Sequence, residues 1–146
     1  MPAANSISPK VLVERFYEDV WNNADEAAAH EILSPDFVFR GSLGPEKNGV
    51  AGFLDYAHAI HTTFRNFHCS IQEMVIEDNR VAARMLFSGM HQARIYGVPP
   101  TGEIVSWAGA AFFETGGRQI NKLWVLGDID SVKSQIGVAM PPNFTT

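Results

Sequence analysis

The sequence predicts an α+β domain in which helices cover one face of a curved antiparallel sheet. Helical spacing of apolar residues marks the chain before residue 65, and the stretch from 67 to 126 reads as strands joined by turns. The chain has 146 residues, of which 46% are hydrophobic and ten are phenylalanine, which is enough for one core. We therefore expect a single domain over residues 1–146, with its core between about residues 8 and 137.

The first helix is predicted from a start signal and an apolar stripe. Ser8 is the expected N-cap and Pro9 occupies the first helical position. The Asn22-Asn23 pair is expected to end the helix. The residues that share one helical face are Val13, Phe16, Tyr17, Val20 and Trp21.

Two more helices and a short strand follow. Asp25 is expected to cap an Ala-rich helix that ends at Leu33, before Ser34-Pro35, and residues 36–40 read as a short strand. A third helix is expected from about Lys47 to Phe64. Its apolar stripe includes one histidine and consists of Val50, Phe53, Leu54, Ala57, His61 and Phe64.

The second half of the chain predicts two hairpins and a last short helix. Residues 67–77 and 80–92 form one pair around Asp78-Asn79, and residues 103–115 and 119–126 form another around Gly116-Gly117. Asp130 or Ser131 is expected to cap the last helix, which ends at Gly137.

The long strands carry apolar residues on both faces, which favours a homodimer. Met85 and Phe87 alternate with Leu86, and Trp107 alternates with Ile104 in the facing strand. Helices can cover one face of such a sheet, and a second subunit can cover the other.

Composition narrows the classes of function. The formal net charge of -5 disfavours a nucleic-acid partner, which needs a surplus of Lys and Arg. Cys69 is the single cysteine, so no internal disulfide is possible, and no cluster of Cys and His predicts a metal site. We expect a reducing, cytoplasmic location, with neither a leader nor a membrane-spanning segment.

An ordered set of short motifs resembles a known family. The motifs are Phe16-Tyr17-Glu18-Asp19-Val20-Trp21-Asn22, Ser34-Pro35-Asp36-Phe37, Gly89-Met90-His91, Gly97-Val98-Pro99-Pro100-Thr101-Gly102, and Trp124 with Asp128 and Gln135-Ile136-Gly137. Together they resemble the SnoaL-like polyketide cyclase family of the nuclear-transport-factor-2-like superfamily, over roughly residues 10–137.

The resemblance implies a cone-shaped α+β barrel with a deep apolar cavity. It also implies a cofactor-free and metal-free cyclase that closes a polyketide ring by intramolecular aldol condensation. The position that matches the family's general acid/base is Asp128. Two residues depart from the family pattern: Lys122 stands where Glu is frequent, and Arg40 stands near the end of an early strand where His is frequent.

Asp128 is the first candidate for catalysis. It ends an apolar strand beside Trp124 and Leu126, and desolvation there is expected to raise the pKa of the carboxyl group, which suits a general base. The alternative is a helix N-cap, although Asp130 and Ser131 are better placed for capping by sequence. The family match favours the catalytic interpretation.

The other candidates are a histidine, an arginine and a set of pocket residues. His91 either hydrogen-bonds a developing enolate oxygen or is satisfied at a strand edge. Arg40 either pairs with substrate or forms a structural ion pair. The remaining residues are expected to line the pocket or belong to the core: Phe53, Tyr56, His61, Met85, Trp107 and Trp124.

Three functions are compatible with these residues. The first is an enzyme of the cyclase, lyase or isomerase type acting on an apolar carbonyl compound, with dehydration and epoxide opening as related reactions. The second is a module that binds an apolar small molecule, and the third is a structural dimer or adaptor domain.

Overall fold

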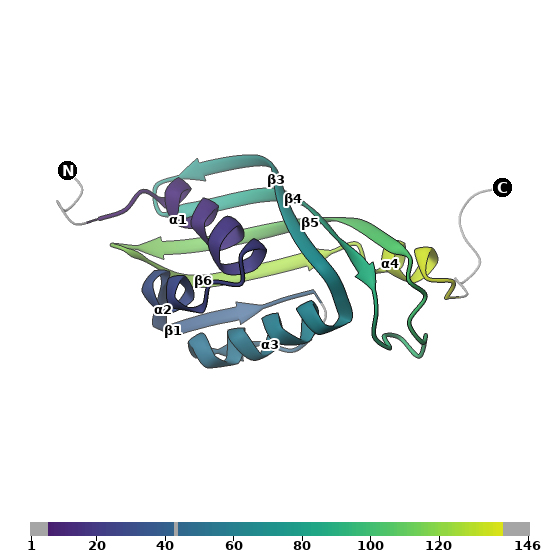
Figure 1. Cartoon of the computed structure of the whole chain (residues 1–146). Helices are drawn as coiled ribbons and strands as arrows, with labels where there is room; N and C mark the ends of the chain where they lie inside the picture. Colours follow the sequence, from purple (N-terminus) through teal and green to yellow (C-terminus); the bar gives the residue numbers. More distant parts are fainter. Residues whose placement is uncertain (1–5, 43, 139–146) are drawn as a thin grey trace.

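A computed structural model describes residues 6–42 and 44–138 and confirms the α+β class. In Figure 1 the N-terminal helices lie across one face of a curved sheet, and a short helix sits at one end of that sheet. The helical segments are α1 (Pro9–Arg15), the π-helix η1 (Phe16–Asn22), α2 (Glu26–Ile32), α3 (Gly49–Thr63) and α4 (Ile129–Gln135).

The sheet contains six strands in the spatial order β2-β1-β6-β5-β4-β3. It is mixed, because β1 runs parallel to β6 while the other neighbours pair antiparallel. The sheet is curved but not closed into a barrel, with β2 and β3 at its edges. The strands are β1 (Leu33–Arg40), β2 (Lys47–Asn48), β3 (Phe64–Glu77), β4 (Arg80–His91), β5 (Ile104–Gly116) and β6 (Gln119–Gly127).

The first helix begins as the sequence predicts and then widens. The Ser8 side chain accepts a hydrogen bond from the backbone N–H of Val11 at 3.2 Å, with Pro9 at the first helical position. From Phe16 onward the helix is of the π type, and the Asn23 N–H donates to Glu18 O at 3.1 Å, five residues back. Such wide turns are rare, and those that do occur are frequently found at functional sites.

Strand β1 begins earlier than expected, at Leu33 rather than Asp36. The preceding helix ends before Ser34-Pro35, as predicted, but the strand already includes this pair, and the reason is visible in the pairing with β6. Its register shifts between Leu33 and Val38, so Pro35 lies in a stretch that forms no ladder pair. Proline lacks an N–H donor and is tolerated where the ladder is interrupted.

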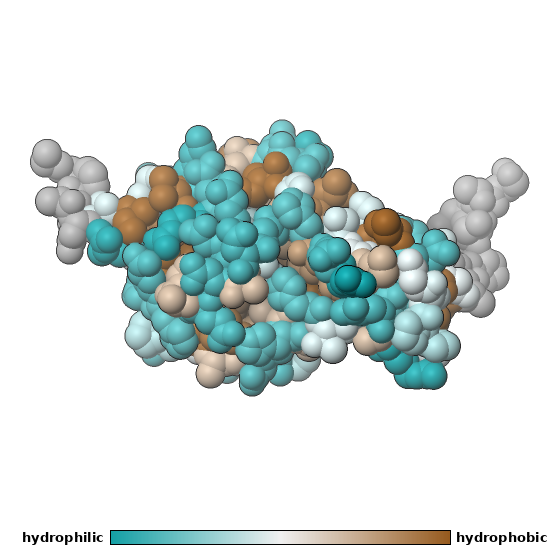
Figure 2. Space-filling view, viewed as in Figure 1, coloured by the Kyte–Doolittle hydropathy of each residue, from teal (hydrophilic) through white to brown (hydrophobic). Residues whose placement is uncertain are grey.

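The core lies between the helices and the concave face of the sheet. Phe53 of α3 is fully buried, and its ring centroid lies 5.0 to 5.9 Å from those of four aromatic side chains: Phe16, Trp21, Phe37 and Phe39. Edge-to-face contacts of this kind add to the stabilisation that burial provides. The helical side of the molecule is mostly hydrophilic outside (Figure 2).

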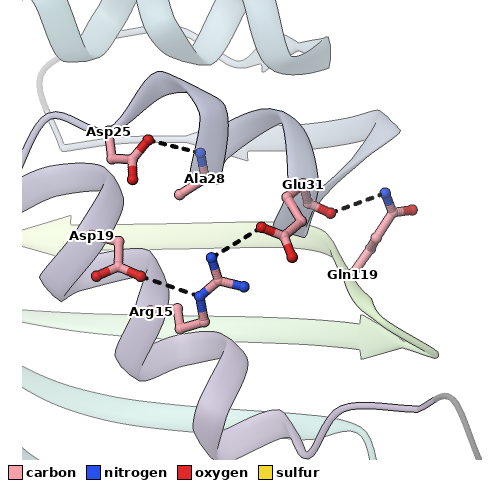
Figure 3. A network of polar contacts seen from close by, with 6 residues as sticks. All are labelled: Arg15, Asp19, Asp25, Ala28, Glu31 and Gln119. Carbon is pink, nitrogen blue, oxygen red and sulfur yellow. Dashed lines mark hydrogen bonds and ion pairs between the residues drawn. The ribbon is translucent and has the colours of Figure 1, made fainter.

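Arg15 connects η1 to α2 at the surface (Figure 3). Its Nε donates to Asp19 Oδ2 and its Nη2 donates to Glu31 Oε2, both at 3.1 Å. Beside them Asp25 caps α2 by accepting from the Ala28 N–H at 3.0 Å, as predicted. None of the described helices is long and apolar enough to cross a membrane.

Candidate functional site

A partly open aromatic cavity lies between η1, α3 and the concave face of the sheet. Its volume is about 40 Å³. This space holds a few water molecules at most, whereas ligand sites commonly measure about 300–1,000 Å³. A larger ligand therefore has to displace part of the wall. The wall consists of Phe16, Tyr17, Trp21, Phe39, Gly41, Ser42, Tyr56, Ile60, Phe67, Cys69, Phe87, Trp107, Leu123 and Val125.

Tyr17 and Cys69 are two residues of this wall with buried polar side chains. Tyr17 is 2% exposed, and its hydroxyl has no hydrogen-bond partner among the described residues. Burial raises the pKa of the Tyr17 phenol well above its usual range, with a smaller contribution from Cys69, and burial likewise raises the pKa of the Cys69 thiol. Both groups are therefore neutral donors at physiological pH.

The structure places four of the predicted pocket residues on the inner side of the fold. Tyr56 and Trp107 line the cavity. Phe53 and Met85 are 0% and 1% exposed, and they belong to the core behind the cavity wall.

Arg40 and Trp124 lie on the opposite face of the sheet, so the expectation that they line the cavity is wrong. Strand side chains alternate between faces, and Leu123 and Val125 of β6 point inward. The Arg40 guanidinium lies 5.1 Å from the Trp124 ring centroid. Arg40 also donates to the backbone oxygen of Val125 at 2.6 Å, which gives it a structural role in joining β1 to β6.

His91 is fully buried but does not line the cavity. Its Nδ1 accepts from the Thr101 N–H at 3.2 Å and lies 2.9 Å from Thr101 Oγ1. The Gly102 N–H donates to His91 O, so His91 holds the loop 92–103 at both side chain and backbone. Its Nε2 has no hydrogen-bond partner in the described part of the chain.

His61 lies behind the cavity wall. Its ring centroid is 5.8 Å from that of Trp21 and 5.9 Å from that of Phe67, and both of these residues line the cavity. Burial lowers the pKa of His61 below its usual 6.5, an effect that an interaction with the Trp21 backbone partly offsets. The neutral imidazole therefore belongs to the aromatic packing.

Asp128 is the N-cap of α4, which corrects the expectation that Asp130 or Ser131 caps this helix. Asp128 Oδ1 accepts from the Ser131 N–H at 3.1 Å. The carboxylate is exposed, so the expected desolvation is wrong too. The reason is the position of α4, which begins directly after β6 and leaves Asp128 at the turn between them.

Asp128 nevertheless follows a residue that touches the cavity wall. A Cβ atom at Gly127 would lie 2.8 Å from Ser42 Oγ and 3.2 Å from Trp107 Nε1, and both of those residues line the cavity. The Asp128 N–H donates to Ala108 O at 2.9 Å, which fixes the backbone at this rim. Capping occupies one carboxylate oxygen, and a carboxylate can accept several further hydrogen bonds.

Gln135 holds α4 against β5, a role that its motif alone did not indicate. The Ser106 N–H donates to Gln135 Oε1 at 3.0 Å, and Gln135 Nε2 donates to Ser106 O at 2.7 Å. The amide also donates to Ser131 Oγ at 2.9 Å. Gln135 therefore fixes α4, which Asp128 caps, against β5.

Sequence reasoning missed Tyr17 as a site residue. The helical stripe assigned it to the core, and its burial confirms that placement. The available signal was chemical: Tyr17 brings a hydroxyl into a stripe that otherwise needs only apolar surface. No group of three or more His, Cys, Asp and Glu side chains that could hold a metal ion occurs in residues 6–42 and 44–138.

Comparison with known proteins identifies the family. The sequence matches the model of the SnoaL-like polyketide cyclases over residues 11–136. The chain therefore belongs to the SnoaL-like polyketide cyclase family. No curated protein matches the sequence.

Solved structures share the fold at low sequence identity. A candidate SnoaL-like polyketide cyclase from Jannaschia sp. CCS1 is 17% identical, with a TM-score of 0.81 over 97% of this chain and 99% of the other. IdmH of Streptomyces antibioticus, a candidate polyketide cyclase, is 23% identical, with a TM-score of 0.81 over 90% and 100%. AclR of Streptomyces galilaeus, a candidate hydroxylase, is 21% identical, with a TM-score of 0.79 over 93% and 89%.

Proposed function

We propose that this protein is a cofactor-independent enzyme that performs acid/base chemistry on a small apolar carbonyl compound held in the aromatic cavity. The observation that carries the proposal is the junction at Gly127, where the cavity wall of Ser42 and Trp107 meets the backbone that bears Asp128. Membership of the cyclase family supports the same class of reaction.

Asp128 is the proposed general base. Its carboxylate removes a proton from the carbon next to a carbonyl group, and the C–H electron pair becomes part of an enolate. In an aldol closure the enolate carbon bonds to a second carbonyl carbon of the same molecule, and the resulting alkoxide takes the proton back from Asp128. Isomerisation, dehydration or epoxide opening would use the same base. His91 holds the loop 92–103 in this proposal, because it does not line the cavity.

The test replaces Asp128 without removing the helix cap. Asparagine caps helices about as well as aspartate, so Asp128→Asn keeps the hydrogen bond to Ser131 N and removes the base. Asp130→Asn is the matched control, since it removes an exposed carboxylate from the first turn of the same helix. We expect loss of proton abstraction only in Asp128→Asn, and equal rates in the two variants would contradict the proposal.

A second candidate function is binding without catalysis. The cavity wall formed by the described residues contains no charged side chain, and Asp128 is exposed at its rim. In this case a small molecule bound in the cavity remains bound equally well in Asp128→Asn. Mass spectrometry of the purified protein under native conditions detects such a ligand.

We also propose that a second copy of the chain covers the outer face of the sheet. This face exposes large apolar side chains, which on a monomer of this size typically mark an interaction site. The exposed members are Leu86 (39%), Ile104 (75%), Phe112 (52%), Trp124 (39%) and Leu126 (52%). Sedimentation equilibrium of the wild type tests this proposal, and a monomer at micromolar concentration would contradict it. The single cysteine supports a reducing, cytoplasmic location.

A further inference from the structure

We propose that the Tyr17 hydroxyl anchors an acceptor oxygen of a neutral aromatic ligand inside the cavity. This inference rests on the proposed function, because it takes the cavity as the ligand site, and it adds the ligand's chemical class and the residue that orients it.

The Tyr17 hydroxyl has no structural partner in the part of the chain that the structure describes. The ring packs against Phe16 and Phe113 at centroid distances of 5.1 and 5.9 Å, and phenylalanine would make both contacts. The oxygen is buried without a hydrogen-bond partner among the described residues. An unsatisfied buried hydroxyl is destabilising, and Tyr17 lines the cavity, so we take the missing partner to be a group that arrives with a ligand.

The chemistry of the cavity wall restricts the charge of the ligand. The residues that line the cavity are aromatic, aliphatic or neutral polar, with no charged side chain among those that the structure describes. A charged ligand would lose its hydration without compensation there, so the ligand must be neutral. Aromatic walls favour a flat ring, and a protonated phenol donates to a carbonyl or similar acceptor oxygen.

Hydrogen bonds between η1 and β3 fix the position of Tyr17. Tyr17 lies in the π-helix η1, and Cys69 faces it from the edge strand β3. At the end of the same π-helix, Asn22 Nδ2 donates to Cys69 O at 2.9 Å, and the Cys69 N–H donates to Asn22 Oδ1 at 2.8 Å. These two bonds fix the segment that carries Tyr17 against the opposite wall, which holds the hydroxyl in place before a ligand binds.

The wall also offers a way to make room. An aromatic ring needs more space than about 40 Å³, since an apolar cavity that binds benzene measures about 150 Å³. Tyr56 is a partly exposed aromatic residue of the wall, and it packs over Gly41, where a Cβ atom would lie 2.5 Å from the Tyr56 ring. A ring that enters the cavity therefore has to displace part of this wall, where the Tyr56 ring also lies 4.9 Å from that of Phe39.

The experiment compares two probes of nearly the same shape. Acetophenone carries a carbonyl oxygen, and α-methylstyrene replaces this oxygen with a CH₂ group. Each is titrated into the wild type, into Tyr17→Phe and into Tyr96→Phe, a control that removes an exposed loop hydroxyl. The indole N–H signals of Trp21 and Trp107 report binding by NMR because both residues line the cavity, while Trp124 on the outer face is an internal reference.

The proposal predicts that Tyr17→Phe weakens acetophenone binding by about ten-fold and leaves α-methylstyrene binding unchanged. The proposal is overturned if Tyr17→Phe binds each probe as tightly as the wild type does, because the hydroxyl would then hydrogen-bond only a bound water. Equal weakening of both probes would also overturn it, since that result indicates a packing role. If the wild type binds neither probe, the cavity is not the ligand site, and the proposed function fails together with this inference.

Discussion

The side-chain amide of Asn22 pairs with both backbone groups of Cys69, at 2.8 and 2.9 Å. Cys69 belongs to β3, the edge strand of the sheet, so the amide occupies the place of a missing neighbouring strand. Gln135 makes the same two-bond contact with Ser106 of β5. In both cases a side-chain amide from a helix satisfies exposed strand backbone and fixes that helix to the sheet.

Asn22→Asp should destabilise the fold through this contact. A carboxylate cannot donate to Cys69 O, so one of the two hydrogen bonds is lost and two oxygens face each other. We expect a loss of about 1–3 kcal/mol in the free energy of unfolding, measured by urea denaturation. Asn23→Asp, at the next and exposed position, introduces the same charge and should change stability little. Equal effects of the two substitutions would contradict the account of this contact.

His61 should make stability depend on pH. Burial lowers its pKa in the folded state below 6.5, so the folded protein binds this proton more weakly than the unfolded chain does. The stabilisation is complete above about pH 6.5 and is lost as the pH falls through the folded pKa. His61→Phe, which keeps an aromatic ring beside Trp21 and Phe67, should therefore lose less stability than the wild type between pH 7 and pH 5.

The control for this pH dependence is His30→Phe, because His30 is exposed in α2. The free energy of unfolding of His30→Phe should fall as the pH is lowered, in parallel with that of the wild type. A His61→Phe variant that follows the wild-type pH profile would show that His61 is not the group responsible.

The N-cap hydrogen bond of Asp128 should contribute to the stability of the fold, independently of any role of Asp128 in catalysis. Asp128→Ala removes the acceptor for Ser131 N and should cost about 1 kcal/mol, whereas Asp128→Asn should be nearly neutral. Thermal denaturation of both variants measures the difference. If both variants retain full stability, α4 does not depend on this cap.

A charge placed on the outer face of the sheet should change the oligomeric state of the protein. Phe112→Asp places a carboxylate where its ring now lies 5.8 Å from that of Trp124, and it should dissociate the proposed dimer. Val11→Asp introduces the same charge at an exposed residue of α1, on the helical side, and should leave the dimer intact. Analytical ultracentrifugation distinguishes the two, and a dimeric Phe112→Asp would place the subunit contact elsewhere.

The sequence was informative where local physics decides the structure. Caps at Ser8 and Asp25 and the hairpin around Asp78 follow from short-range chemistry, and the structure confirms them. The sequence was less informative where the structure depends on which strands pair with each other. Pro35 is accommodated in β1 because the ladder to β6 skips that stretch, and no local signal specifies a parallel partner that is distant in sequence.

The candidate site shows the same division. Tyr56 and Trp107 were expected at the cavity or in the core and line the cavity, because large aromatic side chains are usually placed on the inner side of a fold. Arg40 and Trp124 were placed on the wrong face, since strand register decides which side a residue faces and a shift of one residue reverses it. Capping by Asp128 depends on where α4 begins after β6, which the spacing of Asp128 and Asp130 leaves ambiguous.

The central claim is that Asp128 removes a proton next to a carbonyl group of a molecule held in the cavity. The most direct measurement is solvent deuterium exchange into small ketones and β-keto esters, acetophenone among them, catalysed by wild type, Asp128→Asn and Asp130→Asn. The account predicts exchange with wild type and Asp130→Asn that is lost in Asp128→Asn while the fold stays intact. Exchange that persists in Asp128→Asn, or a wild type that catalyses none across the panel, would contradict it.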